Sequence, residues 1–188
     1  RYFMKVIDLT LNGLKLLKLD RFEDNRGWFE EVYNYDKYKE AGIDNCFVQD
    51  NRSFSKVKGV LRGMHFQKNP YSQAKLVRCT KGMVLDIVVD LRKDSSTYLK
   101  WEAVELSEDR VEQLYIPRGF AHGFYCVSDD VIFEYKVDNV YSKENERSVN
   151  YLDPQFNIDW EHILKGVKPI LSDKDANAPM LEEVDCDF

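Results

Sequence analysis

The chain has 188 residues, of which 32% are charged and 13% aromatic, and its formal net charge is −6. This length can bury a sizeable core without disulfides or a structural metal, and the acidic balance argues against a nucleic-acid partner. No apolar run approaches the ~20 residues of a membrane helix, and no secretory signal is evident. We expect one cytoplasmic, non-membrane domain over residues 1–188, with residues 1–3, ahead of Met4, as an addition outside the fold.

Short strand-like segments recur along the chain and are separated by turn residues. One helix is expected over residues 35–41, ended by Gly42. Many short strands at this spacing favour an all-β sandwich or barrel. From about residue 141 the chain is polar and loop-like, and we expect this segment to wrap the β core. The expected strands are residues 44–50, 59–66, 74–80, 84–91, 101–106, 112–116 and 131–137.

Two of these strands alternate clearly between two faces. In residues 84–91 the odd positions are all apolar, whereas the even positions carry two carboxylates, Asp86 and Asp90. In residues 131–137, Tyr135 falls on the apolar face, opposite Glu134 and Lys136. Its hydroxyl is therefore expected to point inward and to need a hydrogen-bond partner.

The histidines are the residues best suited to moving protons near neutral pH. His65 lies on an expected strand, where Gly63 could allow a bulge that turns both Arg62 and His65 inward. His122 lies between two glycines, which predicts a tight loop. For His65 and His122 a structural role and a functional role both remain open, whereas His162 is expected on the surface.

The remaining polar residues are ambiguous when taken alone. Lys75 lies on a strand, Arg26 in a turn, and Asp175 in what looks like a charged loop. No two histidines are clustered in the pattern of a common metal site, so we expect metal-free chemistry without a cofactor. The four cysteines form no CxxC pair and are expected to be free thiols. Residue by residue, the chain predicts a soluble β-barrel with histidine-centred acid–base chemistry and an anionic ligand.

Several ordered segments make the prediction more specific, because together they resemble the dTDP-4-dehydrorhamnose 3,5-epimerase family (the RmlC-type sugar epimerases). The resemblance runs nearly from end to end of the chain. The matching segments are Asp24-Asn25-Arg26-Gly27, Phe47-Val48-Gln49-Asp50-Asn51, Val60 to Gln67, Lys75-Leu76-Val77-Arg78, Asp86 to Arg92, Ile116 to Phe124, Tyr135-Lys136, Tyr141-Ser142 and Leu171 to Asp175.

The resemblance implies a jelly-roll (cupin-type) β-barrel with short peripheral helices, a homodimer, and no metal or organic cofactor. It implies inversion of C3 and C5 of a nucleotide-linked 4-keto-6-deoxyhexose through an enolate. His65 matches the family's base and Asp175 the carboxylate that orients it. Lys75 matches the cation at the enolate oxygen, and Tyr135 the acid on the opposite face.

The resemblance also implies a set of nucleotide-binding positions, of which Arg26 and Glu31 would reach the site of the partner subunit. Two positions depart from the family pattern. Val140 replaces an aromatic residue often found there, which weakens the assignment of the base, and Arg118 replaces a small or acidic residue. The implied substrate-binding residues are Arg26, Glu31, Gln49, Asn51, Arg62 and His122.

Three alternatives to the double epimerase remain at this point. A single-carbon epimerase, or one acting on another nucleotide sugar, would need the same four catalytic residues. A non-catalytic cupin that binds a sugar nucleotide would be expected to lack the base or its partner. A metal-dependent cupin oxygenase would need metal ligands. The sugar, the base and the pathway product are not determined by the sequence.

Overall fold

The computed structural model describes residues 4–188, so the expectation for residues 1–3 lies outside the described part of the chain. Its elements in chain order are β1 (Lys5–Asp8), β2 (Lys15–Lys18), β3 (Arg21–Asp24), β4 (Gly27–Glu30), α1 (Tyr35–Glu40), β5 (Gln49–Ser55), β6 (Leu61–Gln67), β7 (Lys75–Lys81), β8 (Met83–Asp90), β9 (Trp101–Ser107), β10 (Glu112–Ile116), β11 (Phe120–Cys126), β12 (Val131–Val137), β13 (Glu146–Ser148), α2 (Trp160–Leu164), α3 (Asp173–Ala176) and a 3-10 turn, η1 (Leu181–Glu183).

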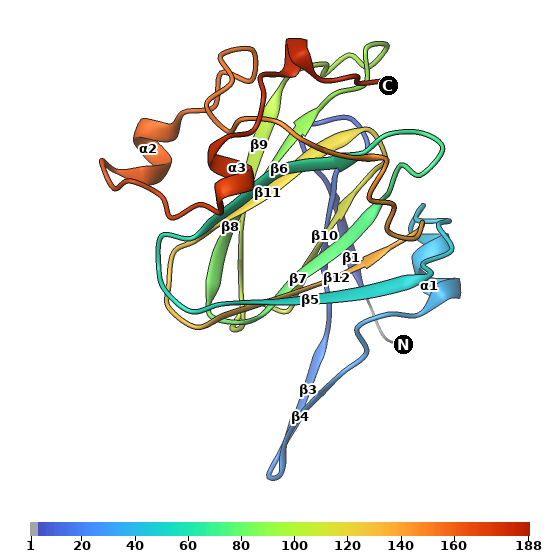
Figure 1. The fold of residues 1–188 in the computed structure, drawn as a ribbon. Helices are drawn as coiled ribbons and strands as arrows, with labels where there is room; N and C mark the ends of the chain where they lie inside the picture. The colour runs from blue at the N-terminus through green and yellow to red at the C-terminus, as the bar shows by residue number, and fades with distance from the viewer. Residues whose placement is uncertain (1–3) are drawn as a thin grey trace.

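Two antiparallel sheets face one another and form the body of the molecule (Figure 1). The six-stranded sheet has the order β1-β2-β10-β7-β12-β5, and the five-stranded sheet has the order β13-β6-β11-β8-β9. The few helices are short and lie at the periphery. The prediction of an all-β, jelly-roll architecture with short peripheral helices is confirmed.

The space between the sheets is filled by apolar side chains that alternate inward along the strands. Phe124 of β11 and Phe133 of β12 stack across this space, with ring centroids 4.2 Å apart. Val88 of β8 and Leu114 of β10 are fully buried in the same cluster. Close packing of this kind fixes the strands that carry polar side chains farther along the same interior.

The C-terminal segment covers the outer face of the five-stranded sheet (Figure 1). Phe156 is fully buried there against the odd-numbered apolar face of β8, which includes Ile87 and Val89. The buried carboxylate of Asp153 accepts the Leu181 N–H at 2.6 Å and so ties the segment together. Strand β8 is therefore buried on both faces.

Most of the strand boundaries agree with the expectation to within two residues, but two predictions are wrong. Residues 44–48 are not a strand; β5 begins at Gln49 and continues to Ser55. Its inward positions carry Gln49, Asn51 and Ser53, so the apolar alternation that reveals a half-buried strand is missing. The second error is the loop expected around His122, which is the fully buried strand β11.

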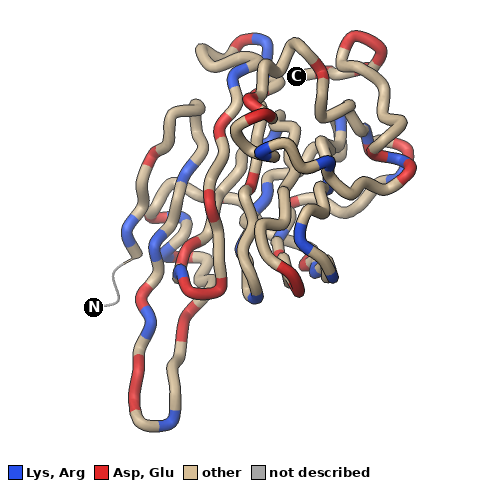
Figure 2. Tube along the Cα trace, turned by 90° about the vertical axis from the view of Figure 1, so that its left-hand side faces the viewer, with Lys and Arg blue, Asp and Glu red and all other residues tan. Residues whose placement is uncertain are grey.

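The hairpin of β3 and β4 stands away from the body (Figure 2). Its turn, Asp24 to Gly27, is the one expected from the sequence, and Gly27 has a positive φ of 133°. Trp28 and Phe29 on this hairpin are largely exposed, although both are large and apolar. The hairpin therefore offers a surface that the body of its own chain does not cover.

Candidate active site

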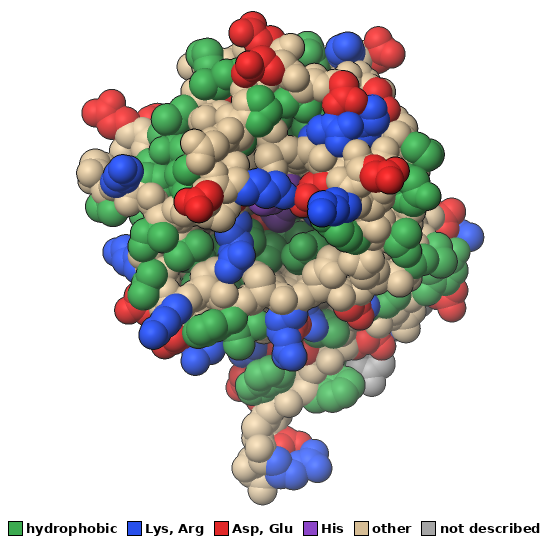
Figure 3. Space-filling model, in the orientation of Figure 1, with side chains coloured by type: hydrophobic (Ala, Val, Ile, Leu, Met, Phe, Trp, Pro, Cys, Tyr) green, Lys and Arg blue, Asp and Glu red, His purple; other side chains and the backbone are tan. Residues whose placement is uncertain are grey.

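A cavity of about 460 Å³ opens between the two sheets, and residues from Ile170 to Asp175 of the C-terminal segment form part of its lining. In the space-filling view it is the central hollow, with histidine at its bottom and charged side chains around it (Figure 3). Arg62, His65, Lys75, His122, Tyr135, Lys174 and Asp175 supply its polar lining. It therefore collects all four residues expected to be catalytic and two of the six expected to bind substrate.

His65 reaches the cavity from β6 and is paired with Asp175 of α3. The Nε2 atom lies 2.6 Å from Asp175 Oδ1, while Oδ2 accepts the Gly63 N–H at 3.1 Å. Burial raises the pKa of Asp175, but the bonds from His65 and Gly63 outweigh it and hold that pKa below its usual value. Asp175 is thus a fixed anion. The prediction of a charged loop at this position is wrong, because Asp175 is buried in a short helix capped by Ser172.

The bulge expected at Gly63 is present. The pairing of β6 with β11 shifts register between His65 and Arg62, and both of these side chains line the cavity. Gly63 has φ of 126°, and a Cβ there would come within 2.6 Å of the Gly123 Cα. Glycine at both positions therefore permits the close backbone contact that turns Arg62 and His65 to the same side.

A second histidine–carboxylate pair lies beside the first, inside the wall of the cavity. His122 of β11 is the direct Cα partner of His65, and its Nε2 lies 2.7 Å from Asp86 Oδ2. Its ring stacks on Phe133 with centroids 6.0 Å apart. Burial lowers the pKa of His122, and the attraction of Asp86 opposes this only in part. The imidazole is therefore held in place and favours its neutral form.

Lys75 and Tyr135 enter from the other sheet, on the neighbouring strands β7 and β12. The Lys75 ammonium lies 5.7 Å from the centre of the Tyr135 ring. Burial lowers the pKa of Lys75 to about 8, while Asp86 and Glu146 oppose that shift. Burial also raises the pKa of Tyr135, and its hydroxyl has the predicted partner, the side chain of Asn51. At neutral pH this wall therefore presents an ammonium and an intact phenol.

His65 and Tyr135 belong to different sheets, so they face the cavity from opposite sides. A base and an acid on opposite sides of one bound ring can remove a proton from one face and return it to the other. Lys75, beside the Tyr135 ring, is placed to stabilise negative charge on an oxygen.

Four of the residues expected to bind substrate lie on strands that line the interior. Gln49 and Asn51 point inward from β5 and are joined by a 2.9 Å hydrogen bond. Arg62 donates from Nε to Ser55 Oγ at 3.1 Å and from Nη2 to the Phe54 carbonyl. These contacts hold the guanidinium at the cavity edge, where it can contact phosphate.

Arg26 and Glu31 do not reach this cavity within the chain. Arg26 is at the hairpin tip, with its side chain 83% exposed and paired with Asp24. Glu31 lies beside Lys37 on a separate groove outside the six-stranded sheet. The expectation that these two residues act at the partner's site stays a prediction.

Reasoning from single residues did not assign four residues that lie at or behind the site. They are Lys174, Glu146, Tyr141 and Asp86. Lys174 lines the cavity, and its ammonium lies 2.9 Å from Glu146 Oε2, which also accepts the Tyr141 hydroxyl at 3.2 Å. Asp86 stands behind His122. The alternation of residues 84–91 places Asp86 on the face that carries the carboxylates, but it does not show that Asp86 contacts His122. Likewise, Lys174 is adjacent to Asp175 in the sequence, but this does not show that it pairs with Glu146.

The two departures from the family pattern lie away from the catalytic residues. Arg118 donates from Nε to Asp138 Oδ2 at 2.9 Å and is not part of the cavity lining. Val140 is half-exposed, and its carbonyl accepts from the Gln67 amide. His162 is an exposed residue of α2, as expected.

Among residues 4–188 no three His, Cys, Asp or Glu side chains are grouped so that they could hold a metal ion. No helix in that range is long and apolar enough to cross a membrane. All four cysteines are free.

Comparison with known proteins gives a consistent family. The model of the family described as dTDP-4-dehydrorhamnose 3,5-epimerase matches residues 8–183. A protein of that name from Shigella flexneri is 45% identical over 97% of this chain and 98% of its own length. The enzyme of that name from Bacillus anthracis, with TDP and PPi bound, has a TM-score of 0.90 and 44% identity, covering 95% of this chain and all of its own. A Legionella pneumophila epimerase in complex with dTDP-4-keto-L-rhamnose has a TM-score of 0.90 and 42% identity, covering 97% and 95%.

Proposed function

The chain belongs to the dTDP-4-dehydrorhamnose 3,5-epimerase family, and we propose that its cavity inverts C3 and C5 of dTDP-4-dehydro-6-deoxy-glucose to give dTDP-4-dehydro-rhamnose. The enzyme is an isomerase. The observation that carries the assignment of residues is the placement of His65 and Tyr135 on opposite sheets, with Lys75 beside the phenol.

His65 is the base. The 4-keto group of the substrate acidifies the hydrogens on C3 and C5, so a neutral imidazole can remove them. Asp175 accepts from Nε2–H, which leaves the Nδ1 lone pair for the substrate proton. The same carboxylate stabilises the imidazolium that forms, and proton transfer by such a group supplies about 10²–10⁴-fold in rate.

Lys75 and Tyr135 complete the reaction. Loss of the proton moves negative charge onto the C4 oxygen, and the Lys75 ammonium stabilises that enolate. Tyr135 then donates its phenolic proton to the opposite face of the carbon, which inverts the centre. Because the Lys75 pKa is about 8, the ammonium is the main form at neutral pH.

The nucleotide part extends from the cavity over polar side chains at its rim. Arg62 and Lys174 supply positive charge for the diphosphate, and Gln49 and Asn51 supply amide donors and acceptors. His122 contributes its ring edge from the cavity wall. Tyr141, half-exposed at the rim, offers a ring on which a nucleobase can stack.

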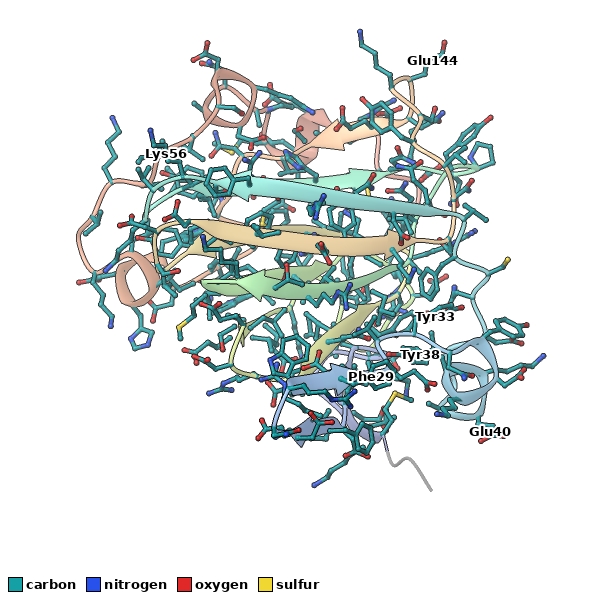
Figure 4. The ribbon with its side chains drawn as sticks, turned by 90° about the horizontal axis from the view of Figure 1, so that it is seen from below. Phe29, Tyr33, Tyr38, Glu40, Lys56 and Glu144 are labelled. Atoms are coloured by element: carbon teal, nitrogen blue, oxygen red, sulfur yellow. The ribbon has the colours of Figure 1, made fainter. Side chains whose placement is uncertain are left out.

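The active form is a homodimer in this proposal. A groove of about 620 Å³ runs outside the six-stranded sheet and is lined by residues that include Glu31 and Arg52. Viewed from below, Tyr33 and Tyr38 lie side by side at the edge of that sheet, with ring centroids 5.1 Å apart (Figure 4). A second copy packed there would cover the projecting hairpin and bring Arg26 and Glu31 to the other subunit's diphosphate. The four free thiols favour a reducing compartment, which supports a cytoplasmic enzyme.

Deuterium incorporation tests the reaction. The protein is incubated in D₂O with dTDP-4-dehydro-6-deoxy-glucose, and NMR follows the signals of C3 and C5. We expect deuterium at both carbons with the wild type and with His162→Asn, which changes an exposed histidine, and at neither with His65→Asn. Exchange at one carbon alone would show a single-carbon epimerase, and no exchange would contradict the proposal.

Complementation tests the dimer. Arg26→Ala and His65→Asn each damage one part of the site, and the two chains are co-expressed. If Arg26 acts on the partner's site, a mixed dimer has one complete site, and random pairing restores about a quarter of wild-type activity. If Arg26 acts within its own chain, the mixture shows no recovery above the sum of the two separate variants.

A further inference from the structure

Strand β8 directs two carboxylates into the interior, and their surroundings differ. Both Asp86 and Asp90 are 0% exposed. Asp90 accepts hydrogen bonds from the Arg92 side chain and N–H and from the hydroxyls of Ser95 and Thr97, at 2.6–3.0 Å. Asp90 is thus fully satisfied by its own loop.

Asp86 has far less. Its Oδ2 bonds to His122 at 2.7 Å, whereas its Oδ1 has no hydrogen-bond partner anywhere in residues 4–188. A fully buried carboxylate with a single bond to a neutral ring is costly unless a positive charge lies within reach. Such a charge is within reach, because the half-buried Lys75 of the opposite sheet lines the same cavity as His122, and Asp86 raises its pKa.

We propose that Asp86 is a positioning residue for the reaction: its carboxylate holds the His122 ring and serves as the buried counter-charge of the Lys75 ammonium. The proposal rests on the function of Lys75 given above. Asp86 does not line the cavity itself, so it acts on the substrate only through these two side chains.

The groups around Lys75 determine how the effect can be measured. The Tyr135 ring faces it from β12, His122 from β11, Asp86 from β8 and Glu146 from β13. Asp86 raises the Lys75 pKa against burial more than Glu146 does. Removal of the Asp86 charge should therefore lower the Lys75 pKa more than removal of the Glu146 charge does.

The test compares Asp86→Asn with Asp90→Asn, its matched control on the same face of the same strand. NMR of labelled lysine, assigned with Lys75→Arg, gives the Lys75 pKa without any substrate. We expect Asp86→Asn to lower it by about one unit or more and Asp90→Asn to leave it unchanged. Glu146→Gln should give a smaller shift than Asp86→Asn. An unchanged Lys75 pKa in a folded Asp86→Asn protein would overturn the proposal.

Kinetics supply the second readout. Asp86→Asn should move the alkaline limb of kcat to lower pH, so that a one-unit fall in the Lys75 pKa reduces kcat near pH 8 by about fivefold while KM changes little. Removal of a negative charge near the enolate would otherwise speed the reaction, so an unchanged or faster kcat would contradict the proposal. Asp90→Asn should lower Tm and leave the pH profile in place.

Failure of the proposed function can be distinguished from failure of the role proposed for Asp86. If wild-type protein shows no deuterium exchange while the Lys75 pKa still falls in Asp86→Asn, the proposed function fails and the electrostatic link stands. If Asp86→Asn does not fold, the labelled Asp86 carboxyl carbon of the wild type is followed instead. Its signal should shift as Lys75 titrates near pH 8. A carboxyl signal that does not respond to the titration of Lys75 would overturn the proposal.

Discussion

His65–Asp175 and His122–Asp86 are the same chemical pair in two environments. The two histidines are direct partners on the paired strands β6 and β11. The His65 side chain is 31% exposed and His122 only 7% exposed. Asp175 comes from the C-terminal segment, whereas Asp86 comes from the central strand β8.

The difference shows that access decides the role of such a pair. A histidine open to the cavity can exchange protons with a bound molecule, and its carboxylate has a second bond, from Gly63, that fixes its position. A histidine buried behind Phe133 contributes shape and charge to the wall. We therefore expect substitutions in the first pair to act mainly on rate, and those in the second to act on stability as well.

His65→Asn should have the largest effect. Loss of the base should reduce kcat by about 10³–10⁴-fold, measured by NMR of the product. Stability should change little, because Asp175 keeps the Gly63 N–H and Lys174 nearby. A residual rate within tenfold of the wild type would show that another group removes the proton.

Asp175→Asn should have the second largest effect, a loss of about 10³-fold in kcat. An amide can donate to Nε2, which places the histidine proton on Nδ1 and removes the lone pair that faces the cavity. Asp173→Asn, on an exposed position of the same helix, is the control and should retain full activity. Equal losses in the two variants would point to disruption of α3 rather than to the pair.

His122→Asn should affect stability more, and activity less, than His65→Asn does. The shorter amide cannot reach Asp86, so the free energy of unfolding should fall by about 2–3 kcal/mol. Activity should fall by only about 10–10²-fold, because the base and the acid remain. Denaturant unfolding and steady-state kinetics on both asparagine variants measure the contrast. If the two variants behaved alike, the distinction between the pairs would be lost.

Sequence patterns predict a strand well when one of its faces is apolar and the other polar. They fail for a strand that is buried on both faces. Residues 131–137 alternate, and the inward direction predicted for Tyr135 is the one observed. Strand β11 is covered by the core on one face and by the C-terminal segment on the other, so it shows no alternation. Its glycines then suggested a loop, although Gly123 serves a close backbone approach: a Cβ there would lie 2.7 Å from the Arg62 carbonyl.

Reasoning from single residues predicted less of the site than of the fold. Asp175 lies 110 residues after His65, and nothing local to its short helix indicates that contact. Only the family resemblance joined the two. The inner face of β5 was hidden for a related reason, since Gln49, Asn51 and Ser53 line the interior and break the apolar period. Asp86 was visible in the pattern of residues 84–91, but its lone bond to His122 depends on how β8 and β11 pair.

Lys75→Met should change stability less than His122→Asn does, and in the opposite direction. Lys75 has a pKa of about 8 in the folded protein and an ordinary value of 10.5, so between these values the unfolded chain binds more protons. Stability of the wild type therefore rises with pH across that window, and below it the ammonium is a full cost to the fold. Methionine removes the charge and fills a similar volume, so the free energy of unfolding near pH 7 should rise by about 1–2 kcal/mol, allowing for partial solvation of the lysine.

Denaturant unfolding of both proteins at several pH values measures this gain. It should shrink as the pH rises from about 8 toward 10.5, because the wild type loses the charged lysine there. Activity should fall by about 10²–10³-fold in the same variant, since the enolate loses its cation. A stability gain combined with this loss of activity would show that Lys75 is kept for the reaction at the expense of the fold. A destabilised Lys75→Met would instead place Lys75 among the groups that hold the two sheets together.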